Sequence, residues 1–286
     1  MNKASVRSVG KRVSRWGEGP IWWEGALYFV DILGHELVRF NPETGEEAAW
    51  DLGEPVGTVV PTDGEEVIYA GAAGCFRFDP ISGQKTLLAG NPESANRFND
   101  GKCDPLGRLW VGTISAPRQP DAALYCLDGR RGLQKRLTGI TNSNGIGWSI
   151  DGKTMYYIDT PTRKVQAFPY ALSEGVLGEP EVCVDTVSAG IDGSPDGMAI
   201  DNEGMLWVAF CHGGCVAQFD PETGRTMRKI SFPTVETTAC AFGGPELDRL
   251  YVTTGIKADL VEPEAGRLFV VEGLGVKGLP AQPFRG

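Results

Sequence analysis

A short motif occurs six times along this chain of 286 residues, and its spacing restricts the possible folds. The fullest copy, residues 97–112, has a polar Asn-Asp-Gly entrance, a turn at residues 104–107 and an apolar strand that includes Trp110 and Val111. Aligning the copies on the residue equivalent to Trp110 gives the positions Tyr28, Ile68, Trp110, Tyr156, Trp207 and Tyr251. The copies therefore follow one another at steps of 40 to 51 residues.

A second motif, a strand that runs into a tight turn, lies within each step. It is clearest at residues 38–45, 76–83 and 217–224, where Asn or Asp precedes Pro and a Gly closes the turn. Short strands and hairpin turns that recur about every 40 to 50 residues are typical of propeller blades with four strands each. The sequence therefore predicts an all-β fold, a six-bladed β-propeller of four-stranded antiparallel blades, with residues 1–286 as a single domain.

The two ends of the chain are expected to differ in role. Residues 6–14 alternate loosely between apolar and polar side chains, which predicts an outer strand for the last blade. Such a strand would close the ring and remove the open edge of a sheet. The segment after Gly273 is irregular and predicts no particular element.

Charge, hydrophobic runs and cysteines exclude several classes of partner and location. The net charge of −10 disfavours a nucleic-acid partner, because binding phosphate needs a basic face. No apolar stretch approaches the ~20 residues that span a membrane, and the basic N-terminal residues lack the apolar run of a secretory signal. The seven Cys, an odd number without a Cys-x-x-Cys pair, indicate reduced thiols and a cytoplasmic protein. We expect a monomer or a weak dimer.

Four of the six copies carry an oxygen-bearing side chain at nearly the same distance before the aligned aromatic residue. Glu18, Asn99, Asn144 and Asp196 lie 10, 11, 12 and 11 residues before it. Because the innermost strand of each blade lines the central channel, these side chains would form a ring of oxygens. Two carboxylates that converge there without a Lys or Arg partner would repel one another, and one divalent cation would relieve the repulsion. Oxygen ligands suit Ca²⁺, Mg²⁺ or Mn²⁺, and Zn²⁺ is a further candidate.

Other interpretations compete with this one. Asn-Gly and Asp-Gly are common turn dipeptides, but four copies at matched distances, lacking in the other two repeats, favour a site. Cys211 and Cys215 flank His212 as in a metal clip, but no second ligand pair follows at zinc-site spacing. A Ser-His-Asp mechanism is disfavoured, because the chain has only two His and no Gly-x-Ser-x-Gly elbow.

Four blocks of this sequence resemble the SMP-30/gluconolactonase/luciferin-regenerating-enzyme family, the regucalcin-like proteins. The blocks are residues 17–20, 97–102, 143–149 and 194–198, and the resemblance covers essentially the whole chain in order. It implies a six-bladed propeller with one divalent cation in its channel and, as in many members, hydrolysis of a sugar lactone. It also implies that Glu18, Asn144 and Asp196 are the metal ligands.

The resemblance also implies which residues face the substrate. Arg97 and Asn99 would contact substrate hydroxyl groups, and Asp100 matches an acidic residue close to the site. Some members bind sugar hydroxyls through a Glu in the loop after the first strands of the third blade, where this chain offers only Asp121. His212, in a turn of the fifth blade, is expected either to contact substrate at the channel rim or to be a solvated turn residue.

The predicted function is the metal-dependent hydrolysis of a sugar-acid lactone, an aldonolactone such as gluconolactone or a pentonolactone, to the free acid. The cation would polarise the carbonyl group and lower the pKa of a bound water. Asp196 would accept a proton from that water, and Arg97 would hold the substrate, unless Arg97 pairs with an acid at the surface instead. Two alternatives are a non-catalytic propeller that binds calcium or a protein partner, and an esterase or phosphotriesterase with the same metal site.

Overall fold

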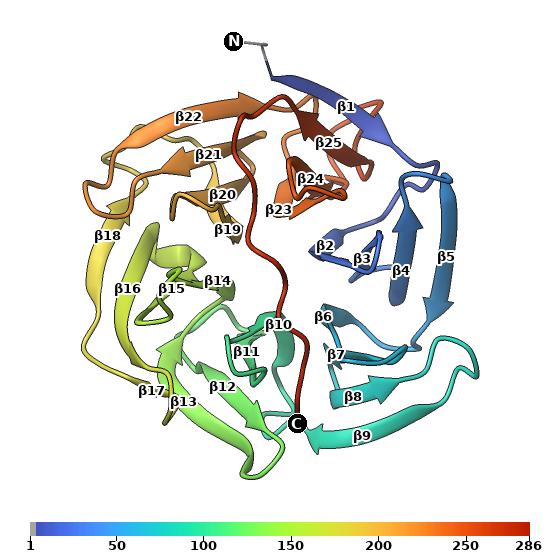
Figure 1. Cartoon of the computed structure of the whole chain (residues 1–286), viewed down its shortest axis with the longest axis vertical. Coiled ribbons are helices and arrows are strands. Elements are labelled where there is room, and N and C mark those ends of the chain that lie inside the picture. Colours follow the sequence, from blue (N-terminus) through green and yellow to red (C-terminus); the bar gives the residue numbers. More distant parts are fainter. Residues whose placement is uncertain (1–3) are drawn as a thin grey trace.

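Residues 4–286 are described by the structure, a computed structural model, and they form a closed ring of six β-sheets (Figure 1). Five sheets have four strands, and one has a short fifth strand. The described part of the chain contains no α-helix and one 3-10 helix, η1 (Thr160–Thr162). The prediction of a six-bladed β-propeller with four-stranded antiparallel blades is confirmed.

Each of the first three blades is built from four consecutive strands. Blade 1 contains β2 (Gly17–Trp23), β3 (Ala26–Asp31), β4 (Glu36–Asn41) and β5 (Glu46–Asp51). Blade 2 contains β6 (Val56–Pro61), β7 (Val67–Gly71), β8 (Gly74–Phe78) and β9 (Lys85–Gly90). Blade 3 contains β10 (Arg97–Cys103), β11 (Leu109–Ile114), β12 (Ala122–Asp128) and β13 (Gly132–Ile140).

The other three blades include the short extra strand and the N-terminal strand. Blade 4 contains β14 (Ser143–Trp148), β15 (Thr154–Asp159), β16 (Lys164–Ala171), β17 (Val176–Leu177) and β18 (Glu181–Asp185), the last two both paired with β16. Blade 5 contains β19 (Ser194–Ile200), β20 (Leu206–Cys211), β21 (Cys215–Phe219) and β22 (Thr226–Ser231). Blade 6 contains β23 (Thr237–Gly243), β24 (Arg249–Thr254), β25 (Leu268–Glu272) and β1 (Ser5–Val9).

The N-terminal strand β1 closes the ring. It pairs antiparallel with β25, from Ser5 opposite Glu272 to Val9 opposite Leu268. The predicted outer strand is therefore confirmed, although it occupies residues 5–9 rather than the expected 6–14. Because β1 covers the outer edge of β25, the two ends of the chain complete one blade and close the ring.

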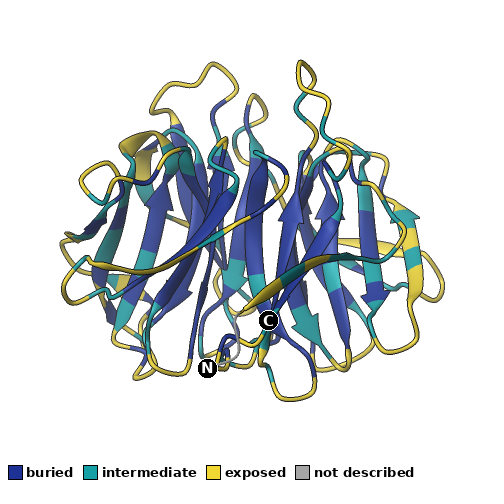
Figure 2. Cartoon of the chain, turned by 90° about the horizontal axis from the view of Figure 1, so that it is seen from above, coloured by how far each residue is buried: buried dark blue, intermediate teal, exposed yellow. Residues whose placement is uncertain are grey.

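Burial falls from the inner strand of a blade to its outer strand (Figure 2). All six residues of β6 and of β14 are buried, whereas nearly every residue of β22 is exposed. All seven Cys are free, and six of them are buried, as expected for reduced thiols. Within residues 4–286, no helix has the length and apolar character that crossing a membrane requires.

The repeated turn and the repeated aromatic residue stabilise one another in blades 3 and 5. Trp110 and Trp207 are completely buried on the second strands. Their indole N–H groups donate to the turn carboxylates of Asp104, at 3.2 Å, and Asp201, at 2.8 Å. The same Asp104 accepts a hydrogen bond from the backbone N–H of Leu106, so one carboxylate closes the turn and also holds the indole of Trp110 in place.

Every inner strand contains a β-bulge at the same level. The register with the second strand shifts between Glu18 and Ile21, Val56 and Thr58, Phe98 and Gly101, Ser143 and Ile146, Pro195 and Met198, and Thr237 and Ala239. A bulge places two residues opposite one and redirects the local side chains. The bulge is thus a property of all six blades, including the two whose sequences lack the polar entrance.

The segment after β25 crosses one face of the ring (Figure 1). It is held at both sides, because Asn202 in blade 5 donates to the carbonyl of Lys277, and Arg285 donates to the carbonyl of Gly107 in blade 3. Between these anchors, residues 279–282 cover a cavity of about 270 Å³. Aromatic side chains from three blades line that cavity: Trp22, Trp148 and Phe242. The sequence predicted no element here, because the segment is ordered by contacts with distant residues.

Candidate functional site

The four polar residues that the repeats singled out lie at the bulges of the inner strands. Asn99, Asn144 and Asp196 are bulge residues of β10, β14 and β19, and Glu18 directly precedes the bulge of β2. All four are buried, with between 3% and 7% of each residue exposed. Because the bulges share one level, the four side chains meet near one end of the channel, opposite the end that the C-terminal segment covers.

The Gly that follows these residues serves packing rather than turn formation. Gly145 and Gly197 lie within strands. A Cβ atom on Gly145 would lie 2.7 Å from the carbonyl oxygen of Asp196 in the next blade, and one on Gly197 would lie 2.3 Å from Cβ of Ala239. The Asn-Gly and Asp-Gly dipeptides are therefore not turns here. Their Gly residues let neighbouring inner strands approach closely.

Three buried carboxyl groups face a common space in the channel. Burial, and then the charge of Asp100, raises the pKa of Glu18 to about 8. Burial raises the pKa of Asp196 well above its ordinary value, with further contributions from the charges of Glu18, Asp100 and Glu236. Burial also raises the pKa of Asp100. Neighbouring carboxylates thus disfavour ionisation of Glu18 and of Asp196, as expected for like charges at close range.

Within residues 4–286 neither Glu18 nor Asp196 forms an ion pair with a Lys or Arg, although two basic side chains lie close enough to influence the channel acids. Lys102 is half-buried in the channel, where its charge opposes the rise in the pKa of Asp100 and its Nζ donates to the carbonyl of Met198 at 2.7 Å. The charge of Arg97 similarly opposes the rise at Glu18. The sequence around Lys102 gives no indication that its side chain faces the channel. The position of Lys102 depends on how the inner strand β10 is placed in the ring.

A chain of hydrogen bonds orients the amide side chains. Nη1 of Arg97 donates to Oδ1 of Asn99 at 2.7 Å, and Nδ2 of Asn99 donates to Oδ1 of Asn144 at 2.9 Å. Nδ2 of Asn144 donates to Oγ1 of Thr160 at 2.7 Å, and that hydroxyl donates to the carbonyl of Pro195 at 2.9 Å. Thr160 therefore fixes which end of the Asn144 amide faces the site. Arg97 binds neutral oxygens here and is not a surface residue paired with an acid.

Glu18, Asn144 and Asp196 fit a hard divalent cation. Within residues 4–286 no group donates a hydrogen bond to the Asp196 carboxylate, and Glu18 accepts one, from the N–H of Gly19 at 2.9 Å. Buried carboxylates in proteins are normally paired, fully hydrogen-bonded or bound to a metal. Two acids that together accept only this one hydrogen bond, along with an amide oxygen, make a donor set of the kind that Ca²⁺ and similar ions prefer.

The loop of residues 115–121 stands near Arg97 at the same end of the channel. Asp121 is exposed at its end, where its Oδ1 accepts a hydrogen bond from Nδ2 of Asn96 at 3.4 Å. The loop also carries Arg118. Burial, together with the charge of Arg118, lowers the pKa of Arg97 to about 10. A second cation therefore stands beside Arg97, and no motif in the sequence pointed to it.

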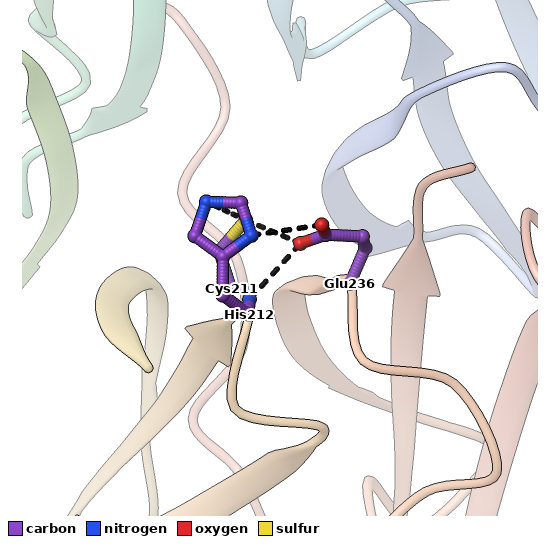
Figure 3. Close-up of side chains that lie close together, drawn as sticks. All are labelled: Cys211, His212 and Glu236. Carbon is purple, nitrogen blue, oxygen red and sulfur yellow. Dashed lines mark hydrogen bonds and ion pairs between the residues drawn. The ribbon is translucent and has the colours of Figure 1, made fainter. Parts of the chain in front are cut away.

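His212 lies at the channel rim, in the turn between β20 and β21, with 56% of its side chain exposed. Its Nδ1 is 2.8 Å from Oε1 of Glu236, which directly precedes β23 of the next blade (Figure 3). The thiol of Cys211 and the backbone N–H of His212 donate to Oε2 of the same carboxylate, at 3.0 and 2.9 Å. Cys215 is not part of this cluster, so the Cys211–Cys215 clip is not formed. Sequence reasoning missed Glu236, because its partners lie in another blade.

The fold and these residues define a class of protein: a six-bladed propeller with an acid- and amide-lined site at one end of its channel. A family model described as SMP-30/Gluconolactonase/LRE-like region matches residues 16–256. The chain therefore belongs to the SMP-30/gluconolactonase/LRE-like family, and the resemblance found in the sequence is confirmed.

Individual relatives match over nearly their whole length. Regucalcin of Danio rerio is 38% identical over 298 residues, covering 100% of both chains. The Bacillus subtilis protein named "Putative sugar lactone lactonase YvrE" is 38% identical over 280 residues, covering 94% of this chain and 95% of that protein. The crystal structure of a calcium-binding protein, regucalcin, from Agrobacterium tumefaciens superposes with a TM-score of 0.92 at 28% identity, covering 99% of this chain and 98% of that one.

Proposed function

We propose that this protein is a metal-dependent lactonase that hydrolyses a sugar-acid lactone, such as an aldonolactone, to the free acid. The observation that carries the proposal is the set of polar side chains at the inner-strand bulges, where the buried carboxylates of Glu18 and Asp196 accept a single hydrogen bond between them. The name of the Bacillus subtilis relative supports the reaction class, and the calcium-binding Agrobacterium regucalcin makes Ca²⁺ the first ion to test.

Glu18, Asn144 and Asp196 would hold the cation, and Asn99 would position the amide oxygen of Asn144. When bound, a divalent cation supplies a Lewis acid for the lactone carbonyl and lowers the pKa of a coordinated water. The chain's own contribution is to hold these groups in a site from which most water is excluded, where charges act strongly.

The substrate would be held and attacked by residues around this ligand set. Arg97 offers guanidinium donors to substrate oxygens, with Arg118 beside it adding positive charge that suits the carboxylate of the product. Asp196 would accept the proton of the attacking water. Asp100 would add a third carboxyl group close to the ligands Glu18 and Asp196. Asp121 and His212, at the mouth, would contact substrate hydroxyl groups.

A titration assay tests the proposal. The protein is stripped with EDTA and acid release from a panel of aldonolactones is followed at constant pH, with Ca²⁺, Zn²⁺, Mn²⁺ or Mg²⁺ added back one at a time. We expect no turnover in the stripped protein and recovery with at least one ion. Tight binding of a cation without turnover on any lactone, simple ester or phosphotriester would instead support a non-catalytic calcium-binding propeller.

A further inference from the structure

The Glu236 carboxylate is buried at the junction of blades 5 and 6, with 1% of the residue exposed. It accepts three hydrogen bonds, from the Cys211 thiol, the backbone N–H of His212 and the His212 ring. All of these donors belong to one turn, so a single acid of blade 6 determines how the β20–β21 turn presents its side chain. The result is an exposed imidazole with a fixed orientation.

The pairing also fixes which ring nitrogen carries the proton. A carboxylate accepts hydrogen bonds and does not donate them, so Nδ1 of His212 must be the N–H that faces Oε1 at 2.8 Å. In the neutral ring Nε2 is then an acceptor. Figure 3 shows this second nitrogen on the side of the ring that points away from Glu236.

The cluster lies beside the acid site. In the β19–β20 ladder Cys211 pairs with Ser194, and Ser194 lies two residues before Asp196 in the sequence. Burial, and then the charges of Asp196 and Glu236, raise the pKa of the Cys211 thiol far above its ordinary value. The thiol donates to Oε2 of Glu236 at 3.0 Å, so groups of the protein itself supply the contacts of this carboxylate.

Apart from the exposed carboxylate of Asp121, the other groups at the mouth offer a substrate mainly hydrogen-bond donors. Arg97 and Arg118 have only N–H groups, and Oδ1 of Asn99 already accepts from Arg97. A sugar hydroxyl is both a donor and an acceptor, so its recognition also needs an acceptor in the protein. An unprotonated Nε2 at the rim supplies one.

We propose that His212 and Glu236 form a dyad in which Glu236 holds the imidazole as its Nδ1–H tautomer and Nε2 accepts a hydrogen bond from a substrate hydroxyl group. Glu236 is the positioning residue and His212 the specificity residue. The part that concerns the hydroxyl rests on the proposed lactonase function, whereas the part that concerns the tautomer does not.

The chain contains its own control. Its other His, His35, occupies the corresponding turn of blade 1, between β3 and β4, and has nearly the same backbone conformation, with φ of 62° against 63° for His212. The left-handed backbone is therefore a property of this turn and is not special to His212. The residue that corresponds to Glu236, directly before β6 of the next blade, is Pro55, which has no carboxylate to hold an imidazole.

The tautomer is tested by ¹⁵N NMR of the ring nitrogens in the full-length protein at a pH where both imidazoles are neutral. We expect His212 as the Nδ1–H form in the wild type and a shift toward the free-imidazole mixture in Glu236→Leu, which has no acceptor for Nδ1–H, with the His35 signals unchanged in both proteins. An unchanged His212 tautomer in a folded Glu236→Leu protein would overturn the dyad, whether or not the protein hydrolyses lactones.

The hydroxyl contact is tested by kinetics on the metal-loaded protein. His212→Ala should raise KM about 2- to 10-fold for an aldonolactone, the worth of one hydrogen bond, and leave kcat and metal content unchanged. For γ-butyrolactone, which has no hydroxyl groups, KM should not change. His212→Gln should restore part of the affinity for the aldonolactone, and His35→Ala should behave as the wild type. An equal change on both lactones, or none on either, would overturn the hydroxyl contact. Absence of lactone turnover in the wild type would count against the proposed function, and the hydroxyl contact would fall with it.

Discussion

The bulges of blades 2 and 6 share the backbone irregularity of the other four bulges but not their chemistry. Blade 2 has Gly57 at this position, and a Cβ atom there would lie 2.4 Å from the carbonyl oxygen of Asn99. The hydroxyl of Thr58 donates to the carbonyl of Gly101, at 2.9 Å, and that of Thr238 in blade 6 donates to the carbonyl of Gly17, at 2.6 Å. These two bulges use their polar atoms to join neighbouring blades.

In blades 1, 3, 4 and 5, the polar side chains at the bulges form the candidate site instead. The bulge itself is therefore a requirement of the fold, whereas the function depends on which side chain each bulge carries. A polar residue at a bulge indicates a functional site only where hydrogen bonds between blades leave some of its polar atoms free. The hydroxyl groups of Thr58 and Thr238 both form such hydrogen bonds.

The largest expected effect follows removal of charge from the polar bulges. Glu18→Gln and Asp196→Asn should each lose most of their bound metal and reduce lactone turnover by about 10²- to 10⁴-fold. Elemental analysis of the purified proteins measures the first effect. Thr58→Val, at a bulge that only joins blades, is the matched control and should retain the metal. Full occupancy in both acid variants would refute the ligand assignment.

Saturating metal should separate two of the ligands. Asn144→Ala weakens metal affinity only, because an amide is not a base, so excess metal should restore much of kcat. Asp196→Asn keeps an oxygen of similar shape but loses the proton acceptor, so occupancy should return without turnover. The two kcat values at full occupancy should differ by about 10² to 10⁴. Equal recovery would mean that Asp196 is a ligand and not the base.

Arg97→Ala should act on the substrate side of the site. Its guanidinium binds Asn99 rather than the expected ligand carboxylates, so bound metal should be unchanged while kcat/KM for aldonolactones falls by about 10-fold or more. Lys102→Met, which removes a cation from deeper in the channel, provides a comparison. Wild-type kinetics on every lactone would show that Arg97 has a structural role.

Gly57→Ala should destabilise the fold through a position with no chemistry of its own. The new Cβ atom would press on the blade 3 backbone at Asn99, and overpacking of this kind costs about 1 to 3 kcal/mol. Urea unfolding measures the loss. Gly90→Ala, in the outer strand of the same blade, meets no atom within 4 Å and should be near neutral. Equal stability of the two variants would contradict the close approach of blades 2 and 3.

The last expected effect is a pH dependence of stability in the EDTA-stripped protein. Folding raises the pKa of Glu18 from 4.5 to about 8, so between these values the folded state keeps a proton that the unfolded state has lost. The free energy of unfolding should therefore fall as pH rises through this window. Glu18→Gln should flatten the slope, and saturating metal should reduce it. A stability that rises from pH 5 to pH 8 in the stripped wild type would contradict the raised pKa.

Much of the architecture follows from local chemistry in the sequence. The Asp-Pro and Asn-Pro turns, the aromatic strands and their recurrence predict the number of blades, because each blade is specified by residues near one another in the chain. Even the four polar residues can be found this way, since equivalent positions in a ring of repeats must face one axis.

The contacts between blades are a different matter, because they depend on how the ring closes. No pattern in the sequence indicates that Glu236 reaches His212, that Lys102 donates to the carbonyl of Met198 in another blade, or that residues 279–282 cover the other end of the channel. Each of these contacts joins residues from different blades or from the tail. Their distances are set by the packing of rigid sheets around the axis, and propensity and periodicity describe only what happens within one sheet.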